Sequence, residues 1–140
     1  MRTTEATTAL DLVRSLYAAY AARDITAIFA ILSPGIRITQ TALLPWGGVF
    51  EGTAGAQRFM ELLRTHVDSV ATIERIFEAG EQVVVTGRTA GRTRASGTPF
   101  DVAIVHVLTV RDGKVVAAEY HIDTPAMLTA LGTPPEAAGA

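Results

Sequence analysis

The order of apolar and polar positions divides the chain into a helical first half and an extended second half. From Thr7 to Arg23, apolar residues recur every three or four positions, which is the spacing of one helix face. Asp24 is a plausible N-cap for a second, shorter helix, and Ser33-Pro34-Gly35 is expected to end that helix. A third helix is predicted from Gly52 to about His66.

Most of the remaining segments predict strands, and one near the C-terminus predicts a short helix. Ile36 to Gln40 alternates apolar and polar residues, as a half-buried strand does. Asp112-Gly113 is the strongest hairpin signal, because a type I′ turn needs positive φ at both central residues. Strands joined so tightly pair antiparallel. A short closing helix is expected from Thr124 to Leu131. The four longer β-type runs are Ser69 to Ala79, Gln82 to Thr93, Pro99 to Arg111, and Lys114 to Asp123.

Helices followed by a meander of strands indicate an α+β fold, with helices on one face of a curved antiparallel sheet. A single domain is expected over residues 1–132, followed by a flexible tail over residues 133–140. Both alternate sets of positions in Asp101 to Val110 are largely apolar, so the outer sheet face also needs cover. A homodimer through that face is predicted, and a short helix or loop over it is the alternative.

Composition narrows the classes of function. Apolar residues make up 49% of the chain, charged residues 19%, and the mean hydropathy is +0.29, which argues against disorder. The absence of cysteine excludes thiolate nucleophiles, cysteine-bound metals and disulfides. A net charge of -2 without a basic run disfavours nucleic-acid binding. A membrane-spanning helix needs about 18 consecutive apolar residues, and no apolar run in the sequence approaches that length. No apolar leader follows Met1, so a cytoplasmic location is expected.

Several segments, taken in order, resemble the SnoaL-like polyketide cyclases of the nuclear-transport-factor-2-like superfamily. They are Leu16 to Asp24, Gly48 to Gly55, Val105 to Val115, and Glu119 to Asp123 with the following Met127-Leu128 and Leu131-Gly132. The resemblance implies a cone-shaped sheet with the N-terminal helices on its concave face. It also implies a deep apolar cavity between the two layers that holds a few polar groups.

Asp123 ends the last predicted strand and is the first candidate for chemistry. The resemblance implies that its position holds the general acid/base aspartate of the family. At the wall of an apolar cavity, desolvation would raise the pKa of the Asp123 carboxyl and suit it to proton transfer near neutral pH. The alternative is that Asp123 caps the short helix that begins at Thr124-Pro125.

Two histidines are further catalytic candidates. His121 shares a strand face with Asp123 and could orient that carboxylate or bind a substrate oxygen, although a surface or interface position is also open. His106 lies inside the apolar strand before it, and pairing counted from the Asp112-Gly113 turn would place it near Glu119. A structural hydrogen bond to Glu119 and a cavity-lining role are both open for His106. Two histidines and a carboxylate could hold a metal, but no metal is expected, because the superfamily rarely uses one.

Five other side chains are candidates for binding a hydrophobic substrate. The Tyr17 and Tyr20 hydroxyls on the first predicted helix could reach the cavity, although core packing is the commoner use of tyrosine. Gln40 on the first predicted strand is a possible donor. Trp46, in a Pro-Trp-Gly-Gly loop, could stack on a flat substrate or fill the core. Phe59 belongs to the apolar stripe of the third predicted helix.

The predicted function is that of an enzyme without a cofactor that cyclises, isomerises or rearranges a hydrophobic, polyketide-like carbonyl compound. Asp123 would move the proton, and His121 or His106 would bind the developing enolate oxygen. A dimeric, non-catalytic binding domain for an apolar small molecule is one alternative. Hydrolysis of an epoxide or lactone is another, and it would require a second carboxylate facing Asp123. No glycine-rich nucleotide motif or serine elbow supports other chemistry.

Overall fold

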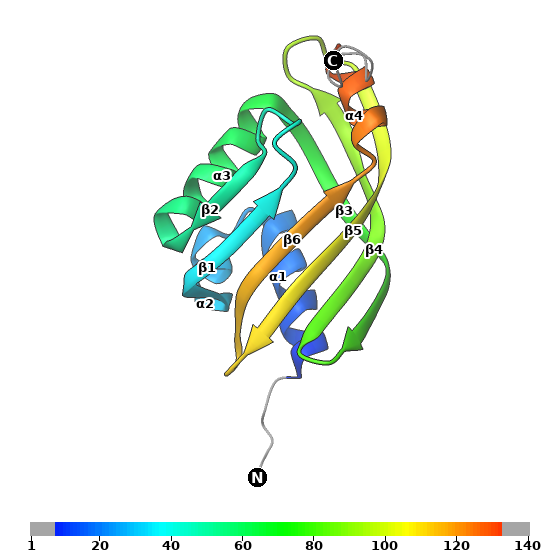
Figure 1. Ribbon diagram of the computed structural model, residues 1–140. Coiled ribbons are helices and arrows are strands. Elements are labelled where there is room, and N and C mark those ends of the chain that lie inside the picture. The colour runs from blue at the N-terminus through cyan, green and yellow to red at the C-terminus, as the bar shows by residue number, and fades with distance from the viewer. Residues whose placement is uncertain (1–7, 133–140) are drawn as a thin grey trace.

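One curved sheet of six strands and four accompanying helices make up residues 8–132, the part of the chain that the computed structural model describes (Figure 1). The helices come mostly before the long strands, so the predicted α+β class is confirmed. The predicted tail over residues 133–140 lies outside the described residues.

The helices begin and end close to where the apolar spacing predicts. α1 (Ala9–Ala22) ends at Arg23, whose backbone is left-handed with φ 56°. Asp24 caps α2 (Ile25–Ile31) as predicted, and its carboxylate accepts a hydrogen bond of 3.1 Å from the N–H of Ala27. α3 (Gly52–His66) and α4 (Thr124–Ala130) complete the set.

The strands are ordered β2-β1-β6-β5-β4-β3 across the sheet. All neighbours are antiparallel except β1 and β6, which pair in parallel, so the expected fully antiparallel sheet is wrong at this one pair. β1 and β6 lie far apart in the sequence, which allows a parallel pair that no tight turn could make. The bounds are β1 (Leu32–Gln40), β2 (Gly48–Glu51), β3 (Val67–Ala79), β4 (Gln82–Thr93), β5 (Pro99–Arg111) and β6 (Lys114–Ile122).

The region around β1 departs most from the predicted elements. Ser33-Pro34-Gly35 lies inside β1, where the register with β6 is irregular between Leu32 and Arg37. Proline has no backbone N–H for a regular ladder, so an irregular stretch is where a strand tolerates it. The short strand β2 was not predicted, because its four residues are fewer than periodicity can recognise.

The last hairpin carries a one-residue irregularity that decides which side chains face inward. Asp112 and Gly113 have φ of 50° and 73°, which confirms the predicted turn. Val110 pairs with Val115, but Thr109 pairs with Ala117, so one extra β6 residue is accommodated as a bulge. Each later pair is therefore shifted by one residue.

This shift changes the partner of His106. His106 pairs with Tyr120 rather than Glu119, so the predicted neighbour is wrong. A shift by one residue exchanges the two faces of a strand. Ala118, Tyr120 and Ile122 consequently lie on the same face as His106, and Ala117, Glu119 and His121 face away.

The core lies between the helices and the concave face of the sheet. α1 packs against β3 and β4, α3 packs against β1, β2 and β3, and α4 packs against β5 (Figure 1). Gly87 lies beside the β3 irregularity between Ile73 and Arg75, and a Cβ there would meet the backbone oxygen of Thr72 at 2.0 Å. Glycine therefore permits the close strand approach at the bend of the sheet.

Candidate functional site

A cavity of about 190 Å³ lies between the helices and the inner face of the sheet, and it is open to solvent on one side. A closed cavity of roughly 150 Å³ can hold benzene, so this space has room for a ring whose substituents extend through the opening. The lining is mainly apolar and aromatic. Its uncharged polar members come from α1, from the loop after β1, and from every strand except β2, and its rim includes two exposed arginines.

The deepest polar contact joins α1 to β5. The Tyr17 hydroxyl and Nδ1 of His106 form a hydrogen bond, and their rings stack with centroids 5.8 Å apart. Burial lowers the pKa of the His106 imidazole to about 3, and the nearby His121 adds to this lowering. Burial also raises the pKa of Tyr17 well above its usual value. The pair is therefore uncharged at neutral pH.

Tyr20 supplies a second buried hydroxyl in the cavity lining. Within residues 8–132 this hydroxyl makes no hydrogen bond. Burial raises its pKa, so it remains protonated. The Tyr120 hydroxyl lies close enough to lower that pKa through a weak hydrogen-bond interaction, but its geometry falls short of a full hydrogen bond. Buried polar atoms almost always have a partner, and an exception needs an explanation. A ligand oxygen in the cavity would satisfy the Tyr20 hydroxyl.

The polar wall on the β1 side is formed by Gln40 and Trp46. The indole N–H of Trp46 donates a hydrogen bond of 2.9 Å to the Gln40 side-chain oxygen. This bond orients Gln40, and within residues 8–132 its amide nitrogen makes no side-chain hydrogen bond and can donate to a ligand. Trp46 is only 1% exposed, so the loop inserts its indole into the core and also lines the cavity.

Aromatic rings form a continuous wall from Phe50 to His106. Phe59 lies between Phe50 and Tyr120, with ring centroids 5.4 Å from each. The Tyr120 and His106 rings follow, with centroids 4.5 Å apart. Phe59, Tyr120 and His106 line the cavity, and a wall of this kind favours flat ligands that can stack on it.

The fold brings six of the eight predicted site residues together around one cavity. Each lines this cavity, although their chemical roles are untested. They are Tyr17, Tyr20, Gln40, Trp46, Phe59 and His106.

Asp123 does not lie at the cavity wall, which corrects its expected placement. Its side chain is exposed and accepts a hydrogen bond of 3.2 Å from the N–H of Ala126, so it caps α4. The capping alternative therefore describes Asp123 in this structure.

His121 also lies away from the cavity. It is exposed, pairs with Val105 across the sheet, and has its Nε2 3.5 Å from a carboxylate oxygen of Glu119. His106 faces inward from the neighbouring strand, so the three residues considered for a metal do not converge. Strand alternation after the bulge places His121 and Asp123 outside.

Tyr120 and the two arginines at the rim line the cavity but are not among the predicted site residues. Tyr120 lies between Ala118 and Ile122 in an alternating row, and recognising that row as the buried face would have identified it. Arg23 and Arg64 give no such signal, because arginine near a helix end is common on any protein surface.

An open curved sheet with helices over its concave face and a cavity between the two layers defines the NTF2-like class of proteins, and solved members of this class share the fold. Within this class the chain belongs to the SnoaL-like domain family, whose family model matches residues 13–118.

Three solved structures illustrate the similarity. An NTF2-like protein from Burkholderia thailandensis is 28% identical, with a TM-score of 0.82 over 94% of this chain and 98% of that one. TerC, co-crystallised with polyporic acid, is 27% identical, with a TM-score of 0.80 over 88% and 97%. A protein from Jannaschia sp. named after the SnoaL-like polyketide cyclases is 25% identical, with a TM-score of 0.80 over 96% and 99%.

No curated protein matches the chain significantly. None of the helices within residues 8–132 combines the length and apolar character needed to cross a bilayer.

Proposed function

We propose that the cavity binds a flat, largely apolar ring compound with carbonyl or hydroxyl oxygens, and that the chain acts on it as a cofactor-independent cyclase or isomerase. The observation that carries this proposal is the uncharged Tyr17–His106 pair in an aromatic cavity, beside the unpartnered hydroxyl of Tyr20. The co-crystal of TerC with polyporic acid supports a small organic ligand for this fold.

The chemistry common to aldol cyclisation and isomerisation is enolisation, in which a carbon next to a carbonyl loses a proton. In one tautomer of His106, Nδ1–H donates to the Tyr17 oxygen and Nε2 is free to accept that proton. The Tyr17 or Tyr20 O–H then donates to the carbonyl oxygen, where negative charge develops. That charge raises the pKa of His106, which can later return the proton to the product.

This mechanism assigns no role to Asp123. Its carboxylate caps α4 outside the cavity, and His106 replaces it as the group that takes the proton. Among the described residues, no aspartate or glutamate lines the cavity. Hydrolysis of an epoxide or lactone by two facing carboxylates therefore receives no support from the site.

A binding domain without turnover is the second candidate function. The observation that favours it is the burial of His106 against Tyr17. This burial lowers the pKa of the imidazole to about 3 and makes it a weak base toward a carbon acid. The two functions differ in one measurable property. A catalyst exchanges protons of the bound ligand with solvent, whereas a binding domain does not.

Binding can be followed through Trp46, the single tryptophan of the chain, which lines the cavity. We expect flat quinones and polycyclic ketones to quench its fluorescence saturably. Trp46→Phe removes the signal, so calorimetry on that variant serves as the control. Absence of saturable binding by either method would contradict the proposed cavity function.

Catalysis can be tested by NMR, as exchange of deuterium from solvent into the carbon next to a ligand carbonyl. His106→Gln and Tyr17→Phe should each slow this exchange about 100-fold or more, the usual contribution of acid/base groups. His121→Gln is the matched control and should leave the rate unchanged. Equal rates in all variants, or no exchange by the native protein, would support the binding domain instead.

The outer sheet face supports a proposal about assembly. Phe77, Val84 and Val107 form an apolar row across β3, β4 and β5, and Val105 is 41% exposed. We propose that a second copy covers this face. Light scattering should show a dimer, and Val105→Glu should convert it to a monomer. Val49→Glu, at a residue 58% exposed on β2, is the control. A native monomer would contradict this proposal.

A further inference from the structure

The charge of the cavity is distributed unevenly. Its rim includes Arg23, at the end of α1, and Arg64, in the last turn of α3. Its other polar groups are phenols, an indole, an amide, the hydroxyls of Ser69 and Thr89, and the His106 imidazole, which burial keeps uncharged at neutral pH. A ligand that fills this space therefore meets neutral donors inside and positive charge at the opening.

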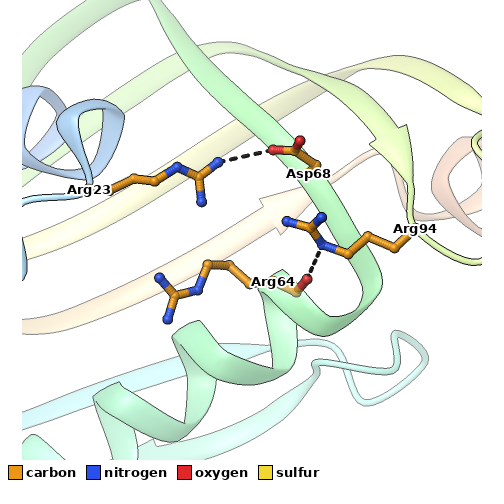
Figure 2. Close-up of polar contacts among 4 residues, drawn as sticks. All are labelled: Arg23, Arg64, Asp68 and Arg94. Carbon is orange, nitrogen blue, oxygen red and sulfur yellow. Dashed lines mark hydrogen bonds and ion pairs between the residues drawn. The ribbon is translucent and has the colours of Figure 1, made fainter.

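Carboxylates near the rim neutralise only part of this charge. Asp68 on β3 accepts a hydrogen bond of 3.0 Å from the Arg23 guanidinium (Figure 2). Asp24 uses its carboxylate to cap α2. In the described part of the chain, no hydrogen bond or ion pair engages the Arg64 guanidinium, and none is drawn to it in Figure 2.

The guanidinium groups of Arg23 and Arg64 are not used to satisfy the free carbonyls at the C-terminal ends of α1 and α3. Helix C-termini carry partial negative charge and can bind arginine side chains. The last carbonyls of α1 accept the backbone N–H of Arg23, and those of α3 accept the side chain and backbone N–H of Arg94 (Figure 2). The Arg64 guanidinium thus remains available at the rim.

We propose that the cavity prefers ring compounds that carry an anionic oxygen group, such as a carboxylate or an acidic ring hydroxyl, on the end nearest the opening. The ring lies among the aromatic side chains, and the anion contacts Arg64 with support from Arg23. This inference rests on the proposed function of the cavity as a ligand site. It adds the charge of the ligand and its orientation, because an anion buried near Tyr120 would lack a counter-charge.

A matched pair of ligands tests the charge preference directly. A hydroxynaphthoquinone that is ionised at neutral pH and its uncharged methyl ether share one ring system. The native protein should bind the hydroxy compound about three- to tenfold more tightly, as measured by Trp46 quenching and calorimetry. Added salt should reduce that difference, because the rim is exposed to solvent.

Charge variants test the assignment to particular residues. Arg64→Gln should remove most of the preference for the anion and leave the affinity for the methyl ether unchanged. Arg58→Gln, on the same helix but outside the cavity lining, is the matched control. Asp68→Asn should strengthen anion binding about twofold or more, because it frees Arg23 from its carboxylate partner.

The outcomes separate this inference from the proposed function. Equal affinities for the two naphthoquinones in the native protein would overturn the charge preference and leave the cavity as a ligand site. If Arg64→Gln lowers the affinity for both compounds equally, Arg64 has a structural role and the inference is overturned. Failure of both compounds to bind the native protein would count against the proposed function and this inference together.

Discussion

His106 and His121 lie on the two strands of one hairpin, yet they occupy opposite environments. His106 faces the cavity, bonds to Tyr17, and remains neutral because burial lowers its pKa to about 3. His121 faces solvent from the other side of the sheet, and its Nε2 lies 3.5 Å from a carboxylate oxygen of Glu119. The chemistry available to each imidazole follows from the strand face it occupies rather than from its place in the sequence.

The same contrast between the two faces separates the tyrosine of β6 from the carboxylates on and just after this strand. Tyr120 lies on the inner face and completes the aromatic wall, whereas Glu119 and Asp123 lie outside. A polar outer row and an aromatic inner row are what an open sheet with one covered face requires. A cluster of ionisable residues that looks catalytic in the sequence can therefore be the solvated side of a strand.

The largest expected difference between the two faces is in stability. Tyr120→Ala removes a buried ring from the wall and should lower the free energy of unfolding by about 3–5 kcal/mol. His121→Ala should change it by less than about 0.5 kcal/mol, because that side chain is exposed. Urea denaturation of the two variants provides the measurement. A similar small loss in both would show that the inner face is loosely packed.

The next effect is the contribution that His106 makes to the pH dependence of stability. Its pKa is near 6.5 in the unfolded chain and about 3 in the folded protein, so the unfolded state binds the proton first as the pH falls. The His106 contribution to the free energy of unfolding should be fully present above pH 6.5. It should fall by up to about 1.4 kcal/mol per pH unit between pH 6.5 and 3.

His106→Gln should remove this contribution to the slope, and His121→Gln should retain it. Denaturation midpoints measured across that pH range give the comparison, with other titrating groups common to both variants. A slope that persists in His106→Gln would contradict the assignment to the buried imidazole.

The smallest effect concerns Asp123. Asp123→Ala removes the α4 cap and should cost about 1 kcal/mol of stability. Asp123→Asn keeps a capping oxygen and should cost less. Neither change should alter deuterium exchange into a bound ketone, because the side chain lies outside the cavity. A large loss of exchange in Asp123→Asn would restore this residue to the mechanism.

Local signals in the sequence were sufficient for much of the fold. The apolar spacing of α3 and the turn chemistry of Asp112-Gly113 depend on neighbouring residues, and both predictions are confirmed. The parallel pairing of β1 with β6 depends on contacts across most of the chain, and no local pattern encodes it. Cavity-lining residues such as Tyr17 and Phe59 were found because aromatic residues on the apolar faces of helices point toward the core.

The error at the site has one physical origin. Counting from the turn is correct as far as Val110, and the bulge then shifts every later pair by one. The sequence Lys114 to Ala118 shows no glycine or proline that would mark this irregularity. The inward position of Tyr120 follows from packing against α3 through Phe59, which becomes known only with the tertiary structure.

The bulge near the start of β6 also has an evolutionary consequence. Loss or gain of one residue there would interchange the two rows of the strand, presenting Glu119 and His121 to the ligand and Tyr120 to water. A single-codon insertion or deletion could thus replace the neutral aromatic wall of the cavity with ionisable side chains, without any amino-acid substitution. Relatives that share this scaffold could diverge in reactivity by such a step as readily as by substitution.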